Sequence, residues 1–591
     1  MSDGSARRRG FHAESGGATY SDPVTLTAPL GIDTAALDED IATLRAGSAR
    51  WAALGALDRA RLLVDALGAT AAVAREWAES AARAKGLDPE SQPAGEEWLT
   101  GPYGLLDALD ATASSLIDLA TRGTTLTGTR FRKAPGDRVA VRVLPEGLAQ
   151  RVLFNGFTAD VWMPPGVTEE QVRQEAGLAA RTGVPGGVAL VLGAGNVSAI
   201  GPLDLLTELV AENRAGLLKL NPTFDELLPV YRQALAPLVD LGVARIVTGG
   251  AEVGAYLTAH PGIDKVHITG SAATHDRIVW GAGEEAERRR AANEPLLDKP
   301  ITSELGGVSP VIVVPGRWSR ADLRHQAEHV ATMRLHNSGH NCIAAQDLVI
   351  SADWAQKAEF LAALRAVMGR LAPRAPWYPG TEAKLAAARA SHPGAEDLAG
   401  RLLVAAPADA EDELFRTEYF APVLGVTELP GTGADFLRRA IAFAGDRLDG
   451  TLGANVVVKP ADRRAMGAEF GDAIAELRYG TIAINAWTGV GFLLARGVWG
   501  GFPGRTLADV GSGIGVVHNA HLIKDPERMV VTGPFQRFPR SLLTGELSLF
   551  PRPPWFVTSR SALATARRLT EYAARPSWAR LLATLVVAFR A

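Results

Sequence analysis

The first third of the chain separates into a helical stretch and a shorter stretch with the texture of strands. Between residues 35 and 121 the sequence is rich in Ala and Leu, and apolar residues recur every three or four positions, as in residues 49–67. This spacing puts the apolar side chains on one face and predicts amphipathic helices. Residues 139–163 instead combine β-branched and aromatic residues with a Pro-Glu-Gly turn, which predicts a two-stranded ribbon whose second strand begins near Val152. Such a ribbon is marginal alone, so we expect it to pack elsewhere on the chain or on a second subunit.

From Val184 onward, short apolar runs alternate with segments of helical periodicity. The pattern predicts helices at 202–215, 224–241 and 251–259 and strands at 188–192, 216–220, 243–247 and 265–269. Alternation at this pitch is typical of βαβ units and a parallel sheet. Ligands of such sheets bind at the carboxyl ends of the strands.

The remainder of the chain predicts a second α/β region and an appended tail. Residues 284–299 are dense in charge and predict a solvated helix or loop, and a new α/β pattern begins near Ile301, with strands at 310–314 and 347–350. After about residue 535, a Pro-rich stretch precedes a basic, Ala- and Leu-rich segment that predicts one helix over 561–590. The length of 591 residues exceeds what a single core accommodates, so several domains are expected.

Composition removes some function classes. Lys and Arg (61) nearly balance Asp and Glu (65), giving a net charge of −4, so no basic surface for nucleic acid is expected. No run approaches the ~20 apolar residues of a membrane span, and the first 20 residues lack the apolar core of a signal peptide. We therefore expect a cytoplasmic protein. A single cysteine excludes an intrachain disulfide and fits a reducing compartment.

Three residues are candidates for chemistry. Cys342 lies in the polar stretch His336-Asn-Ser-Gly-His-Asn-Cys, which favours an accessible thiol, although a free cysteine is more often a small core residue. Glu304 precedes Gly-Gly and a strand, and is either a general base or an ordinary solvated carboxylate. Asn196 follows a strand and Gly-Ala-Gly, so its amide could donate to an oxyanion. That Gly-x-Gly lacks the third glycine and the acidic residue of a dinucleotide fingerprint.

The order of these residues along the chain adds information that none carries alone. The chain resembles the aldehyde dehydrogenase superfamily over roughly residues 35–530, through six motifs in the family's order: Asn196, Lys219, Gly270-Ser271, Ser303-Glu304-Leu-Gly-Gly, Asn337-Ser-Gly-His-Asn-Cys342 and Glu418-Tyr-Phe420.

The resemblance implies roles for these residues. Cys342 would be the nucleophile, Glu304 the base that activates water, and Asn196 an oxyanion donor. The cofactor would be NAD or NADP, held by Lys219 on the adenosine side, Gly270 and Ser271 beneath the pyrophosphate, and Glu418 and Phe420 at the nicotinamide ribose. No metal is expected.

The resemblance also implies a domain plan with an aldehyde dehydrogenase-like α/β fold. It gives a Rossmann-like cofactor domain, an α/β catalytic domain and a β-ribbon oligomerisation element, so a homodimer or homotetramer is expected. The expected boundaries are a flexible N-terminus (1–34), cofactor domain (35–300, ribbon 139–163), catalytic domain (301–480), a return to the cofactor domain or an oligomerisation strand (481–535) and a C-terminal extension (536–591).

Several positions depart from the family pattern. Ala194-Gly195 replaces the usual Pro-Trp before Asn196, His340 stands where the family usually has Gln, and Pro222 replaces a Glu that reads the adenosine ribose. The Gly-Ala-Gly-Asn and Lys-Leu-Asn-Pro segments also resemble the acyl-CoA reductase branch. His340, if protonated, would lower the pKa of the Cys342 thiol, and otherwise would form a loop hydrogen bond.

The implied reaction is NAD(P)-dependent oxidation of an aldehyde to a carboxylic acid through a cysteine thiohemiacetal and thioester. Trp487, Phe492 and Trp499 lie in a late stretch that resembles the family's substrate tunnel, which favours an apolar or aromatic aldehyde unless they are core residues. Three alternatives remain: an NAD(P)H-dependent acyl-CoA reductase, a non-catalytic family member, and a cysteine hydrolase that uses the thiol, His340 and Glu304.

Overall fold

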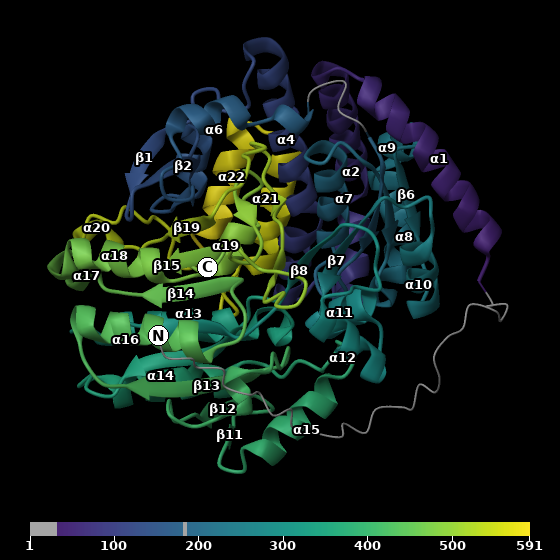
Figure 1. The fold of residues 1–591 in the computed structure, drawn as a ribbon. Helices are drawn as coiled ribbons and strands as arrows, with labels where there is room; N and C mark the ends of the chain where they lie inside the picture. Colours follow the sequence, from purple (N-terminus) through teal and green to yellow (C-terminus); the bar gives the residue numbers. More distant parts are fainter. Residues whose placement is uncertain (1–31, 181–185, 591) are drawn as a thin grey trace.

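Two β-sheets organise the protein in the computed structural model, which describes residues 32–180 and 186–590 (Figure 1). The predicted flexibility of residues 1–34 falls almost wholly outside the described residues. One sheet has six strands in the order β17-β8-β7-β4-β5-β6, and the other has eleven in the order β1-β2-β3-β19-β15-β14-β9-β10-β13-β12-β11.

The six-stranded sheet confirms the predicted parallel alternation. Its strands are β4 (Val188–Leu192), β5 (Ala215–Lys219), β6 (Ala244–Val247), β7 (Lys265–Gly270), β8 (Ile301–Leu305) and the short antiparallel β17 (Gly513–Ile514). The inner strands are buried almost throughout, as expected when helices cover both faces. The connecting helices include α7 (Ile200–Val210), α8 (Leu228–Ala234), α9 (Ala236–Asp240), α10 (Ala251–Ala259), α11 (Ala272–Trp280) and α12 (Gly283–Ala292).

The N-terminal helices pack beside this sheet. They are α1 (Thr34–Ala53), α2 (Ala56–Ala84), α3 (Gly95–Trp98) and α4 (Gly104–Arg122), and α2 contacts both α4 and α8. Trp51, Leu63 and Trp77 are fully buried in the core that these helices share with β4 and β5. The Ala- and Leu-rich periodicity therefore predicted both the helices and their buried face.

The eleven-stranded sheet contains the ribbon as well as the second α/β region. Its strands are β1 (Phe131–Ala134), β2 (Arg138–Leu144), β3 (Thr158–Trp162), β9 (Ser309–Val313), β10 (Ala345–Ser351), β11 (Glu396–Asp397), β12 (Leu402–Ala405), β13 (Val423–Leu429), β14 (Gly453–Val457), β15 (Thr481–Ile484) and β19 (Arg528–Thr532). Strand β3 pairs with β19, which pairs with β15. The ribbon was expected to pack either elsewhere on the chain or on a second subunit, and in the structure it pairs with strands of its own chain.

The sheets divide the chain differently from the predicted domains. Strand β8 belongs to the six-stranded sheet although the catalytic domain was expected to begin at residue 301, and β15 and β19 belong to the eleven-stranded sheet. Only β17 returns to the six-stranded sheet from the 481–535 segment. The sheet to which each strand belongs is set by pairing between distant segments. The local apolar pattern cannot predict this pairing.

Three predicted elements are broken or shifted. The single helix expected over 224–241 is divided into the 3₁₀ turn η4 (Pro222–Leu227) and the short helices α8 and α9. The ribbon strand expected from Val152 begins at Thr158, because Leu148–Leu153 forms the short helix α5. The expected helix over 561–590 is two helices, α21 (Ala562–Ala574) and α22 (Trp578–Ala588), separated at Arg575-Pro576, where proline cannot continue a helix.

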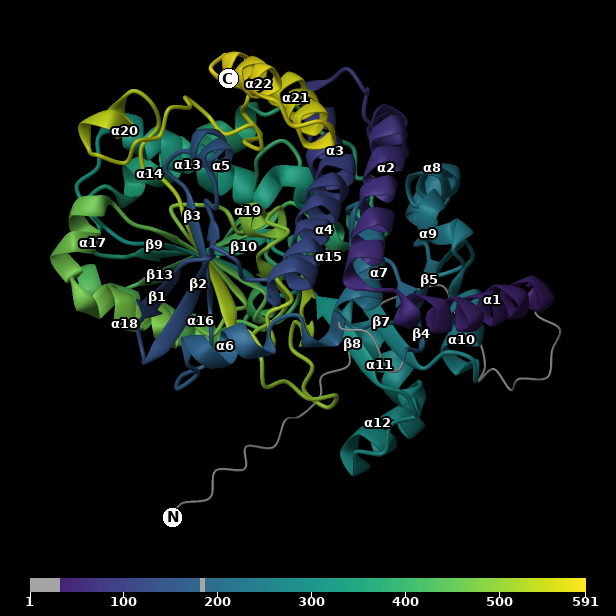
Figure 2. The ribbon, with the colours of Figure 1, turned by 90° about the horizontal axis from the view of Figure 1, so that it is seen from above.

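The C-terminal extension lies against the rest of the molecule. Helix α21 packs on α3, α22 contacts α5, and the short α20 (Arg540–Leu543) precedes both. Figure 2 shows α21 and α22 along the outside of the molecule, with the C-terminus at its rim. No helix within residues 32–180 and 186–590 is both long and apolar enough to cross a membrane.

Candidate active site

The loop that carries Cys342 turns sharply between η5 (His336–Gly339) and β10. Three successive residues, Asn337, Ser338 and Gly339, have positive φ values of 54°, 57° and 82°. Side chains rarely adopt this left-handed backbone, and it persists only where neighbours hold it. The loop is therefore a fixed turn, and its contacts show what fixes it.

A buried cluster of charged and amide groups holds this turn. The Lys85 ammonium, fully buried, donates to Glu97 Oε1 at 2.8 Å, to the Asn196 carbonyl oxygen at 2.8 Å and to Asn337 Oδ1 at 3.1 Å. Asn337 Nδ2 donates to the same Asn196 oxygen at 2.9 Å. A buried ion pair is tolerated when further hydrogen bonds satisfy both charges, and this one links Asn196 to the Cys342 loop.

A second acidic residue supports the same turn from outside. Glu96 Oε2 accepts from the Asn337 backbone N–H at 3.1 Å and from Arg374 Nη1 at 2.9 Å. Burial raises the pKa of Glu96, but Arg374 and nearby cationic groups outweigh it and hold that pKa below its usual value. Sequence reasoning missed Lys85, Glu96 and Glu97, which lie some 240 to 250 residues before Asn337, and Arg374, because no motif or spacing connects any of them to this loop.

Two carboxylates flank the Cys342 thiol. Burial, followed by the charges of Glu304 and Glu418, raises the thiol pKa well above its usual value. Burial and the neighbouring Asp204 charge raise the pKa of Glu304 to about 8, against smaller opposing effects of Cys342 and Trp499. Burial raises the pKa of Glu418 to about 7, with Lys384 and Arg334 acting in the other direction. Near pH 7 the thiol is therefore protonated, and so is most of Glu304, whose ionised fraction alone can take the thiol proton.

Asn196 lies beside Cys342. Both residues line one narrow cavity, which also contains His336 and Asn341. Asn196 Nδ2 donates to the His340 carbonyl oxygen at 2.9 Å, and this bond uses one of the two hydrogens that an amide nitrogen carries. The structure thus brings together the amide and the thiol that were predicted separately.

The walls of this cavity are aromatic. The predicted residues Trp487, Phe492 and Trp499 all line it, and Phe492 packs edge-on against Trp499 with ring centroids 5.3 Å apart. A fourth aromatic wall, Trp555, comes from the C-terminal extension, whose role the sequence did not reveal.

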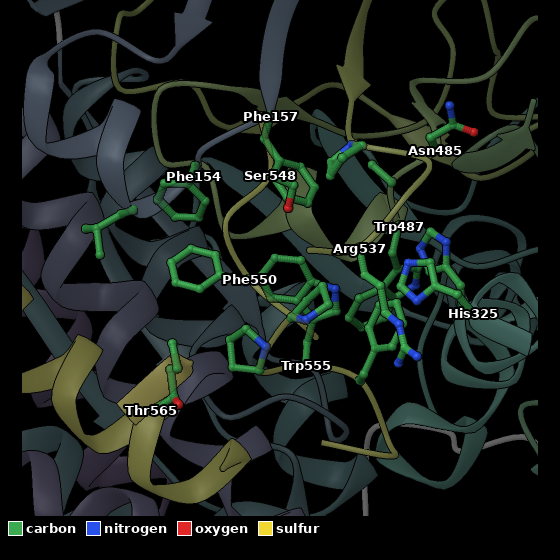
Figure 3. Close-up of a pocket in the computed structure, with 18 of the residues that line it drawn as sticks. Phe154, Phe157, His325, Asn485, Trp487, Arg537, Ser548, Phe550, Trp555 and Thr565 are labelled. Atoms are coloured by element: carbon green, nitrogen blue, oxygen red, sulfur yellow. The ribbon is translucent and has the colours of Figure 1, made fainter. Parts of the chain in front are cut away.

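A second cavity adjoins the first. Trp487 and Trp555 line both cavities, so the two indoles form their common wall. Figure 3 shows both side chains among the residues that line the second cavity. The second cavity is mostly apolar, with Phe154, Phe157 and Phe550 around it and Arg537 at its edge. Helix α13 (Arg320–Leu335) contributes His325, and the extension contributes Thr565.

His340 does not act on the thiol through a positive charge. Burial and the nearby cations Arg334, Lys85 and Arg374 lower its pKa to about 3, so the imidazole is neutral near pH 7. Its Nε2 lies 2.9 Å from Thr381 Oγ1. The hypothesis that protonated His340 lowers the thiol pKa is therefore wrong, and the loop hydrogen bond is what the structure shows.

Three of the residues predicted for cofactor binding, Lys219, Gly270 and Ser271, lie at the carboxyl ends of parallel strands, whereas Glu418 and Phe420 lie in the segment that precedes β13. Lys219 ends β5, and Gly270 ends β7, followed by Ser271, which accepts from the Thr274 N–H and caps α11. Glu418 lies against Gly306, and its Oε1 is a buried oxygen without a hydrogen-bond partner in the structure. Phe420 packs near Tyr378 at a centroid distance of 4.8 Å. These features fit a dinucleotide. The N-terminus of α11 could bind a phosphate group, and the unpartnered Glu418 oxygen could accept a hydrogen bond from a ribose hydroxyl.

The described part of the chain contains no group of three or more His, Cys, Asp or Glu residues arranged to hold a metal ion.

Comparisons with known proteins point in one direction. Residues 227–384 match the model of the Aldehyde dehydrogenase family. A chloroplastic betaine aldehyde dehydrogenase of Amaranthus hypochondriacus is 36% identical over 137 residues, 23% of this chain and 23% of that protein. A peroxisomal aminoaldehyde dehydrogenase of Pisum sativum is 36% identical over 110 residues, 18% of this chain and 19% of that protein. The chain thus matches about a fifth of the length of these curated relatives.

Similarity to solved structures extends much further along the chain. An indole-3-acetaldehyde dehydrogenase in complex with NAD⁺ has a TM-score of 0.56 at 17% identity, covering 85% of this chain and 89% of that one. An NADP-dependent glyceraldehyde-3-phosphate dehydrogenase of Bacillus halodurans C-125 has a TM-score of 0.54 at 19% identity, covering 84% and 91%. At this identity the likeness establishes the fold.

Proposed function

We propose that this chain, a member of the aldehyde dehydrogenase superfamily, oxidises an aldehyde to a carboxylic acid with Cys342 as its nucleophile. The observation that carries the proposal is the cavity in which the Cys342 thiol and the Asn196 amide lie together, with the Glu304 and Glu418 carboxylates acting on that thiol.

The first step is addition of the thiol to the aldehyde. Glu304, whose pKa is about 8, accepts the thiol proton as the sulfur attacks the carbonyl carbon. The oxygen of the resulting thiohemiacetal takes negative charge, and the Asn196 amide and the Cys342 backbone N–H donate to it. Loss of one such donor typically costs ~10²–10³-fold in rate. Lys85 and Asn337 hold the Asn196 backbone in place, so their contribution is positional.

The second step removes hydride and leaves a thioester on Cys342. The chemistry that a nicotinamide supplies when bound is acceptance of that hydride. Lys219, Gly270, Ser271, Glu418 and Phe420 would hold the dinucleotide. Both NAD and NADP fit these residues. Pro222 stands where the family often has a Glu, so this position has no carboxylate to repel the 2′-phosphate of NADP and also no cation to bind it.

Release of the product requires a nucleophile at the thioester. Glu304 first loses to solvent the proton that it took from the thiol. It then removes a proton from water, which attacks the thioester carbon, and it returns that proton to the departing Cys342 sulfur, so that the carboxylic acid and the Cys342 thiol are released. A CoA thiol in place of water would give the acyl-CoA branch of the same chemistry. The indole and phenyl walls of the cavity favour an apolar or aromatic aldehyde.

We further propose a homodimer or homotetramer located in the cytoplasm. Strand β1 forms one end of the eleven-stranded sheet as far as the structure describes the chain, and an edge strand can pair with a second copy. The molar mass in solution, measured by light scattering after gel filtration, tests this assembly.

The function is tested by following NAD(P)H formation with aldehydes of varied length and aromaticity, supplied with NAD or NADP, with and without CoA. We expect acid production without CoA, and loss of activity by more than about 10³-fold in Cys342→Ala. Asn196→Ala should retain dinucleotide binding and lose about 10²–10³-fold in kcat. No NAD(P)H from any aldehyde, or equal activity in Cys342→Ala, would overturn the proposal, and strict CoA dependence would replace hydrolysis by acyl transfer.

A further inference from the structure

Exposed apolar side chains concentrate on the C-terminal extension. Of the fourteen large hydrophobic residues that the described chain exposes, eight lie within residues 536–591. They form what we call the docking face, made of Leu542, Leu543, Leu547, Leu549, Trp578, Leu582, Val586 and Phe589. Leu543 is 88% exposed and Trp578 58% exposed, which is unusual for side chains of this size in one short segment.

Half of the docking face is one stripe along α22. Trp578, Leu582 and Val586 follow one another at four-residue intervals, and Phe589 comes three residues later, so all four lie on one side of the helix. Leu581, Thr584 and Ala588 are buried on another side. The helix is thus apolar both toward the protein and toward the outside, and its outer position is visible in Figure 2.

The other half joins this stripe through aromatic contacts. The Phe589 ring lies 5.7 Å from the Phe550 ring and 6.1 Å from the Phe538 ring, centroid to centroid. Phe538 and Phe550 bracket α20 and the exposed leucines that follow it. The stripe and these leucines therefore belong to neighbouring parts of one surface.

The extension is also strongly basic. Residues 536–591 contain nine arginines and no lysine against two glutamates, which gives +7, whereas the whole chain carries −4 and residues 1–535 therefore −11. Arg575, Arg580 and Arg590 flank or begin α22, are exposed, and have no acidic partner among the residues that the structure describes. Unpaired arginines beside exposed apolar side chains indicate a partner that is both apolar and anionic.

We propose that the docking face binds the surface of an anionic lipid bilayer, with α22 lying in the interface. A basic helix with Trp, Leu and Phe on one side has the properties of interfacial helices, which insert apolar side chains at the headgroup boundary. Anionic headgroups attract arginines close to the surface. Two copies of this face would instead bring the arginines around α22 that have no acidic partner, Arg575, Arg580 and Arg590, toward the same arginines of the second copy, so charge favours the lipid over self-association through the docking face.

The position of α22 connects this surface with the interior. Thr584 and Ala588, on its inner side, line the apolar cavity that shares Trp487 and Trp555 with the Cys342 cavity. A bilayer on the outer side would bring apolar molecules to within one helix of that cavity. The docking itself rests on the surface of the extension and is independent of the proposed reaction.

Vesicle co-sedimentation of the full chain tests the proposal. We expect binding to vesicles of phosphatidylcholine with phosphatidylserine, much weaker binding to pure phosphatidylcholine, and release at high salt. Leu582→Asp/Val586→Asp should weaken binding by more than about tenfold, because two apolar contacts are lost and two like charges are added to the lipid's own. Brominated lipids should quench wild-type fluorescence more than that of Trp578→Phe.

A matched control distinguishes an effect of the docking face from a general effect of added negative charge or of lost stability. Leu57→Asp/Val64→Asp places the same charges at exposed apolar positions of α2, and it should bind vesicles as wild type does. Equal binding to neutral and anionic vesicles, no binding at all, or the same loss in both double variants at unchanged melting temperature would overturn the proposal. So would a fall in molar mass in Leu582→Asp/Val586→Asp with vesicle binding intact, because the face would then join two copies.

Discussion

The Glu304 carboxylate shows how burial brings the pKa of a common acidic residue close to the neutral range. Removal from water disfavours its charged form, and the buried Asp204 adds repulsion, so its pKa rises to about 8. A base works best when its pKa lies near the working pH. The same burial raises the pKa of the Cys342 thiol. Transfer of the thiol proton to ionised Glu304 therefore moves one negative charge from the carboxylate to the sulfur and creates no second charge.

This carboxylate should govern the pH dependence of the reaction. Only deprotonated Glu304 accepts a proton, so kcat/KM should rise with pH through about 8 and fall about tenfold per pH unit below it. Glu304→Gln should lower the rate by about 10²–10⁴-fold and abolish this inflection. Asp204→Asn removes a neighbouring negative charge, so it should move the inflection to lower pH. An inflection that stays in place in both variants would show that another group titrates.

At the scale of elements, the end of β8 explains why two glycines follow Glu304. A Cβ added at Gly306 would lie 2.0 Å from Glu418 Oε1, and one at Gly307 would lie 2.8 Å from the Gly450 Cα. The turn therefore permits Glu418, from a distant segment, to approach within contact of the strand that carries Glu304. This close approach is what places two carboxylates around one thiol.

Gly306→Ala should displace Glu418 and weaken dinucleotide binding. Loss of one hydrogen bond to a charged group costs about 1.5–3 kcal/mol, so the KM for NAD or NADP should rise about 10- to 100-fold while the fold is kept. Gly254→Ala in α10 is the control, because the nearest atom to its added Cβ lies 3.9 Å away, and its kinetics should match wild type. Pairing Gly306→Ala with Glu418→Asp, a shorter acid, should restore part of the affinity. Unchanged KM in Gly306→Ala would place Glu418 outside the cofactor site.

For the whole molecule, the C-terminal extension is part of the site and not only an appendage. Trp555 lines the cavity of Cys342 even though 213 residues separate them, and it also walls the second apolar cavity. Arg552 of the same segment pairs with Glu328 on α13 at 2.8 Å, which ties the extension to the helix that leads into the Cys342 loop. The size of the cavity beside Cys342 therefore depends on how this tail is docked.

Trp555→Ala should join the two cavities. We expect kcat/KM for long or bulky aldehydes to rise relative to short ones, because the indole no longer separates the spaces. Removing a buried indole should also cost about 3–5 kcal/mol of stability and lower the melting temperature. The control is Trp578→Ala, which removes the same side chain from the exposed side of α22. In lipid-free buffer it should change neither the chain-length preference nor the melting temperature. An unaltered chain-length preference in Trp555→Ala would show that the second cavity is closed to substrate.

The sequence by itself determined most of the local structure and supplied the candidates for the reacting groups. Apolar periodicity and turn residues act over a few positions, so they predicted the parallel strands from Val188 to Thr269 and the amphipathic N-terminal helices. Motif order predicted Cys342, Glu304 and Asn196, and the structure brings Cys342 and Asn196 into one cavity, with Glu304 acting on the thiol.

Only the tertiary structure decided what depends on contacts between distant segments and on exclusion of water. The Lys85–Glu97 pair, the neutral state of His340 and the elevated pKa of Glu304 arise from burial, which no local pattern encodes. The pairing of β3 with β19 and the placing of Trp555 over Cys342 follow from how separate elements pack. The residue type determines which chemical group a side chain carries. Its neighbours in the folded structure determine its protonation state and the atoms that it can contact.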